Sequence, residues 1–148
     1  MHLKKIFMKT IKSISFFSIT LIFLLNISSC KKDSLKNCNE HSVSDCNEDS
    51  TKINIRIHNL SDYDFCNVVL DPSQASTNYG IIEKNQSTCY RSFDLAYNYA
   101  YVQLFIGEKE FVFQPIDYVG EQPLSTGSHT YSVNVTDFDN GVLSIEVE

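Results

Sequence analysis

Five cysteines offer the widest chemistry in this chain of 148 residues, because a thiol can form a disulfide, ligate a metal or carry a covalent group. They are Cys30, Cys38, Cys46, Cys66 and Cys89. His41 lies between Cys38 and Cys46, and cysteine with histidine is a common zinc donor set. A structural zinc site needs four ligands, however, and this segment offers only three, with no Cys-x-x-Cys pair. We therefore expect no metal site and favour disulfides formed in an oxidising compartment.

Nucleophilic catalysis has little support in the sequence. A serine nucleophile needs a positioned base, and the chain has no Gly-x-Ser-x-Gly motif. His58 falls at the end of one expected strand and His129 at the start of another, so we interpret both as surface histidines.

Paired carboxylates are the remaining catalytic option, since a hydrolase can use two acids. Asp62 with Asp64 and Asp137 with Asp139 are two such pairs, and both lie in expected turns, where aspartate is common without any catalytic role. Residues 137–141 also resemble a calcium loop, but Gly141 is the fifth residue of that stretch and an EF-hand requires glycine at the sixth. A carboxylate-dependent hydrolase stays an alternative hypothesis.

The N-terminal segment has the pattern of a secretory signal peptide. Lys4, Lys5, Lys9 and Lys12 precede an apolar run over residues 14–27. A membrane-spanning helix needs about 20 mostly apolar residues, so an uncleaved anchor is the less favoured alternative.

The residues Ile27-Ser28-Ser29-Cys30 end this segment and resemble the lipobox of bacterial lipoproteins, in the relaxed form found in the Bacteroidetes. The resemblance implies cleavage after residue 29 and a covalent lipid at Cys30, with no other cofactor. It also implies a cell-envelope location anchored in a membrane. Asp33 does not directly follow Cys30, so the inner-membrane retention signal is absent and we expect the outer membrane.

With Cys30 acylated, four cysteines remain and three pairings exist. We favour Cys38–Cys46 and Cys66–Cys89, because each pair lies within one expected structural unit. Free buried thiols at Cys66 and Cys89 are the alternative.

Residues 30–50 are rich in Ser, Asn, Asp, Glu and Lys, which predicts a disordered tether. Ser34 and Ser50 lie in triplets that resemble an O-glycosylation motif, with a plain linker as the equal alternative. All eighteen acidic residues but only eight of the twelve basic residues follow position 29, which gives a net charge of −10 and makes nucleic acid a poor partner.

Short alternating segments fill residues 51–148. Ile53, Ile55 and Ile57 alternate with polar residues, which indicates a half-buried strand. Asn140-Gly141 is a strong hairpin signal. The expected strands are residues 52–58, 65–70, 79–83, 87–93, 97–106, 110–114, 129–135 and 142–147. For residues 92–100 a helix is the weaker alternative. We predict one all-β domain, an antiparallel β-sandwich of about eight strands with Ig-like or Greek-key architecture.

Two stretches are candidate binding surfaces. Tyr99 and Tyr101 belong to a tyrosine row in the most apolar segment of the mature chain, where cross-strand packing is the alternative explanation. Asp117 and Tyr118 lie in a long segment without strand pattern, and such loops are often functional. We expect a non-enzymatic, membrane-anchored module that binds, or forms a structural part with, an envelope protein or glycan. The alternative hypothesis is a glycan-binding accessory module whose binding surface is formed by these tyrosines.

Overall fold

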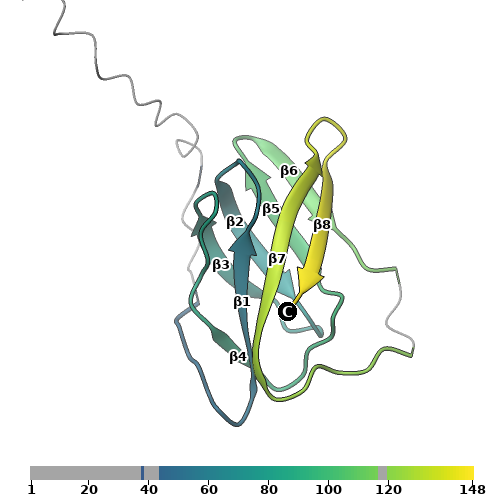
Figure 1. The fold of residues 1–148 in the computed structure, drawn as a ribbon. Coiled ribbons are helices and arrows are strands. Elements are labelled where there is room, and N and C mark those ends of the chain that lie inside the picture. Colours follow the sequence, from purple (N-terminus) through teal and green to yellow (C-terminus); the bar gives the residue numbers. More distant parts are fainter. Residues whose placement is uncertain (1–37, 39–43, 117–119) are drawn as a thin grey trace, which may run out of the picture. The chain divides into compact units, whose positions relative to one another are not determined.

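The computed structural model describes residue 38, residues 44–116 and residues 120–148, which form two four-stranded sheets (Figure 1). One sheet has the order β4-β1-β7-β8 and the other β3-β2-β5-β6. The strands are β1 (Ile53–Asn59), β2 (Phe65–Asp71), β3 (Thr77–Ile82), β4 (Arg91–Phe93), β5 (Tyr101–Ile106), β6 (Lys109–Phe113), β7 (Gly127–Asp137) and β8 (Val142–Val147). The predicted eight-stranded sandwich is confirmed. Within this described part no helix is long and apolar enough to cross a membrane.

One strand pair departs from the antiparallel prediction. β1 pairs in parallel with β7, with Ile53 opposite Gly127 and Asn59 opposite Val133. Parallel neighbours cannot be joined by a tight turn, and these two strands are separated by all the others except β8. The local alternation in β1 therefore predicted the strand but carried no information on the direction of its neighbour.

The core fills the space between the sheets. Ile53, Ile55 and Ile57 point inward from β1 and are almost fully buried, as the alternation predicted. Val102 and Leu104 of β5 meet them from the other sheet's inner face and are also buried. Removing a buried isoleucine side chain typically costs 2–5 kcal/mol, so this layer sets the position of both sheets.

The tyrosine row is shorter than predicted. β5 begins at Tyr101, and residues 94–100 form a loop rather than a strand or a helix. The amide of Tyr97 donates to the carbonyl of Pro72, and the Tyr97 carbonyl accepts the hydroxyl of Tyr131. These long-range bonds replace the main-chain hydrogen bonds that a strand would make with its neighbours. Ala96 and Ala100 are fully buried, which also holds the loop against the core.

The end of the predicted tether belongs to the folded domain. The amide of Ser44 donates to the Asn78 carbonyl in β3, and the amide of Asn47 donates to the Tyr90 carbonyl beside β4. Residues 44–48, here called the edge segment, therefore run beside the outer edges of both sheets (Figure 1). The prediction of a disordered tether up to residue 50 is wrong for residues 44–50, because main-chain bonds and a buried arginine, not apolar bulk, hold them.

Arg91 connects the edge segment to the core. Its Nε and Nη2 atoms donate to the Ser44 carbonyl at 3.0 and 2.7 Å, and its guanidinium lies 4.1 Å from the centre of the Tyr79 ring. Only 4% of Arg91 is exposed, and this burial lowers the pKa of the guanidinium. Burial also raises the pKa of the Tyr79 hydroxyl, which donates to the Ile55 carbonyl at 3.1 Å. A flat cation on an aromatic face gives the edge segment a fixed attachment point.

Both disulfides join the predicted tether to the sandwich, so the favoured pairing is wrong. Cys38 pairs with Cys66 in β2, and Cys46 pairs with Cys89 just before β4, with Cα–Cα distances of 5.3 and 5.8 Å. Proximity in sequence favoured a local Cys38–Cys46 bond. The edge segment instead places Cys46 beside Cys89, just before β4.

This connectivity predicts the products of proteolysis. Digestion without reductant should release one linked fragment that contains Cys38 and Cys66 and another that contains Cys46 and Cys89, identified by mass spectrometry. Replacing Cys46 and Cys89 together by serine should preserve the Cys38–Cys66 fragment. A fragment that joins Cys38 to Cys46 in the unmodified protein would contradict the structure.

Candidate functional site

A hollow of about 390 Å³ lies at the end of the sandwich where β2 turns into β3 and where β4 ends. Its volume is within the range of small-molecule sites, roughly 300–1,000 Å³. Four of its eight lining residues carry a hydroxyl group, and we call it the hydroxyl-lined hollow. It is lined by Ser73, Ala75, Ser76, Thr77, Ser92, Phe93, Asp94 and Leu95.

Asp71 shapes one wall of the hollow. This last residue of β2 accepts hydrogen bonds from the amides of Ser73 and Ala75 at 3.1 and 2.9 Å, and from the Ser76 hydroxyl at 3.1 Å. Gln74 has a φ of +68°, in the left-handed region, so the loop turns sharply at this residue. The carboxylate thus fixes a tight loop whose hydroxyls face the hollow.

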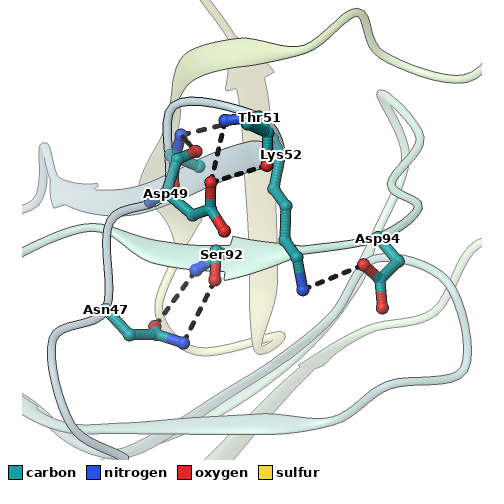
Figure 2. A network of polar contacts seen from close by, with 7 residues as sticks. Asn47, Asp49, Thr51, Lys52, Ser92 and Asp94 are labelled. Atoms are coloured by element: carbon teal, nitrogen blue, oxygen red, sulfur yellow. Dashed lines mark hydrogen bonds and ion pairs between the residues drawn. The ribbon is translucent and has the colours of Figure 1, made fainter.

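A second part of the lining comes from the end of β4, which the edge segment contacts from outside the hollow. Figure 2 shows these polar contacts. The side-chain amide of Asn47 donates to the Ser92 hydroxyl, and its carbonyl oxygen accepts from the Ser92 amide, both at 3.1 Å. Lys52 lies 3.0 Å from Asp94, and this ion pair raises the pKa of the lysine. Asp94 itself is well exposed, so the pair orients the carboxylate at the rim without burying it.

The turn before β1 supports Lys52. The backbone of Asp49 is held by the buried side chain of Asn54, which accepts from its amide and donates to its carbonyl, both at 2.8 Å. The Asp49 carboxylate accepts the hydroxyl and the amide of Thr51 at 2.7 and 2.8 Å, which lowers its pKa (Figure 2). The turn is therefore fixed on both sides of the chain, and Lys52 leaves it toward the hollow.

A second hollow of about 240 Å³ adjoins the first. Ser73, Gln74, Leu95 and Tyr97 line it, and Ser73 and Leu95 line both hollows. The Ser73 hydroxyl donates to the Leu95 carbonyl at 2.6 Å, which joins the loop after β2 to the loop after β4. Leu95 is 40% exposed and contributes apolar surface to both recesses.

The predicted tyrosine row lies only partly in a strand. Tyr99 is 55% exposed and lies in the loop before β5, whereas Tyr101 is half-buried as the first residue of that strand. The two residues do not form a strand face, because the chain between residues 94 and 100 is irregular. Tyr97, from the same row, lines the second hollow. Asp117 and Tyr118 lie outside the described residues, as does Cys30 with the whole predicted signal peptide.

Two of the four acids singled out in the sequence, Asp64 and Asp137, accept structural hydrogen bonds. Asp64 accepts the Lys84 amide at 2.9 Å. Asp137 accepts the side chain and the amide of Asn140 in the β7–β8 hairpin, and these bonds lower its pKa. Among the residues the structure describes, no group of three or more His, Cys, Asp or Glu could hold a metal ion. The Nε2 atom of His129 contacts the Ser125 carbonyl at 2.8 Å.

The hollow residues were not identified from the sequence. Ser76, Thr77 and Asp94 form no motif, and serine, threonine and aspartate are the usual residues of turns. The one available signal was the segment from Ser73 to Thr77, which is rich in hydroxyl residues. This connection between two expected strands is longer than a tight hairpin requires.

Comparisons with known proteins leave the function open. No family model and no curated protein matches the chain. The chain is similar to a solved structure described as the NMR structure of the protein from Eubacterium rectale, with a TM-score of 0.47 and 12% sequence identity. That similarity covers 66% of this chain and 87% of the other.

The loop after β2 provides a test of how the hollow is built. Asp71→Ala removes the acceptor of three hydrogen bonds, so amide hydrogen exchange at Ser73 and Ala75 should accelerate and unfolding should become easier by about 1–2 kcal/mol. Asp71→Asn keeps one acceptor oxygen, so its free energy of unfolding should fall by less than that of Asp71→Ala. Unchanged exchange in Asp71→Ala would mean that the carboxylate does not hold the loop.

Proposed function

We propose that this chain is a non-enzymatic, lipid-anchored binding module of the bacterial cell envelope, and that the hydroxyl-lined hollow is its binding surface. One observation carries the proposal. The chain joins the sandwich at Cys66, near the start of β2, whereas the hollow adjoins the other end of the same strand.

The spacing between the lipid, the attachment point and the hollow also supports the proposal. A lipid at Cys30 would be separated from Cys38 by eight residues, which span at most roughly 28 Å when fully extended. Cys66 and Asp71 lie five residues apart along β2, which separates the point of attachment from the hollow by about 17 Å. A short spacer at one end and a recess at the other would present the recess away from the membrane, where a binding partner can reach it.

A binding role also agrees with the side chains of the hollow. Its hydroxyls and its exposed carboxylate can form several directed hydrogen bonds, which is how binding sites fix a ligand's orientation. Of the candidate catalytic acids, Asp64 and Asp137 accept hydrogen bonds from turn residues.

The anchor is tested by metabolic labelling with an alkyne fatty acid. The wild-type protein should incorporate the label and sediment with membranes, whereas Cys30→Ala should do neither. Cys46→Ser together with Cys89→Ser keeps Cys30 and should still be labelled. Equal labelling of the wild type and Cys30→Ala would disprove the lipoprotein assignment.

The binding surface is tested by filling the hollow in living cells. Ala75→Trp places a large ring in the hollow and should reduce the amount of envelope material cross-linked to the protein by formaldehyde at least several-fold. Val142→Trp adds the same ring at an exposed position of β8 and serves as the matched control. An equal cross-linked yield from Ala75→Trp and Val142→Trp would place binding elsewhere on the domain.

A further inference from the structure

The hydroxyl-lined hollow has a chemical character that narrows the ligand class. We propose that it binds a neutral polyhydroxylated ligand, namely a short segment of a glycan, with its first unit in the larger hollow and its next unit in the smaller one. This inference rests on the proposed function, because it names the ligand of that same surface.

The hydrogen-bonding groups match sugar hydroxyls, which both donate and accept. The Ser76 hydroxyl donates to Asp71, so its oxygen can still accept. The Ser92 hydroxyl accepts from Asn47, so its hydrogen can still donate. Asp94 contacts Lys52 through Oδ1, and its second oxygen can accept two further hydrogen bonds at the rim. The hollow therefore offers donors and acceptors side by side.

The apolar groups match the other feature of a sugar, its C–H face. The exposed Leu95 lines both hollows and Tyr97 lines the smaller one, whereas Phe93 in the larger hollow is only 6% exposed and belongs to the core. Since both hollows share Ser73 and Leu95, a linear ligand can pass from one to the other without leaving the surface. Two adjoining recesses with a common apolar ridge fit a chain of at least two units.

Charge argues against an anionic ligand. No lysine or arginine of the described ranges lines the hollow, and Lys52 beside it is already paired with Asp94 at 3.0 Å. Asp71 lies directly behind the Ser76 hydroxyl, and the chain after position 29 has a net charge of −10. A phosphate or carboxylate would meet this negative field without a free cation in the hollow, so the ligand is neutral.

The sheet edges argue against an extended peptide. Peptides often bind by adding a strand to an open edge, and the main-chain hydrogen bonds give the affinity. The edges beside the hollow are those of β3 and β4, and the edge segment already bonds to both, from Ser44 to Asn78 and from Asn47 to Tyr90. A ligand in the recess is therefore recognised by side chains and not by adding a strand to a sheet edge.

Saturation-transfer difference NMR on the chain purified from membranes into nanodiscs tests the proposal. The probes are maltotriose, cellotriose and N,N′-diacetylchitobiose as neutral glycans, sialyllactose as an acidic glycan, and a trialanine peptide. At least one neutral probe should show saturation transfer. Thr77→Val, which is isosteric, and Asp94→Asn should each weaken its binding by about tenfold, the loss expected for one hydrogen bond.

Matched controls separate this result from a general loss of folding. Thr136→Val and Asp139→Asn make the same changes at exposed positions near the β7–β8 hairpin and should leave binding unchanged. Saturation transfer from none of the neutral probes, stronger binding of sialyllactose or trialanine, or full binding by Thr77→Val and Asp94→Asn would overturn the glycan assignment. Those outcomes leave the lipid label and the Ala75→Trp cross-linking result intact, so the proposed function is judged separately.

Discussion

The buried guanidinium of Arg91 is the contact on which the arrangement of this domain depends. It stacks on Tyr79 of one sheet, belongs to β4 of the other, and binds the carbonyl of Ser44 in the edge segment. Burial of an arginine is costly unless its donors are used, so the edge segment supplies an acceptor that the two sheets alone do not. Three parts of the chain, distant in sequence, thereby become one unit.

The hydroxyl-lined hollow is a consequence of that unit. Asn47 reaches Ser92 because the edge segment is held beside β4, and Lys52 reaches Asp94 because the turn at Asp49 follows directly. The other wall depends on Asp71 at the end of β2. The recess therefore forms where the end of β4 meets the loop after β2, and the edge segment holds β4 in place from outside the lining.

Local patterns predicted local structure well. The alternation of Ile53, Ile55 and Ile57 gave β1, and Asn140-Gly141 gave the last hairpin, because side-chain period and turn chemistry act within a few residues. The partners of Cys38 and Cys46 could not be derived, since they depend on contacts 28 and 43 residues away. Tyr97 has strong strand propensity, yet its carbonyl bond with Tyr131 places it in a loop. The hollow was missed because turn residues and ligand-binding hydroxyls have the same composition.

The two disulfides overlap along the chain, since Cys46 lies between Cys38 and Cys66, and Cys66 lies between Cys46 and Cys89. In a chain that is exported with its N-terminus first, Cys38 and Cys46 enter the oxidising compartment together, before either native partner. The nearest thiols can then combine first, and thiol–disulfide exchange must release them before the native pairs form. For the exported protein proposed above, formation of the native pairs would then include an exchange step, which a disulfide isomerase accelerates.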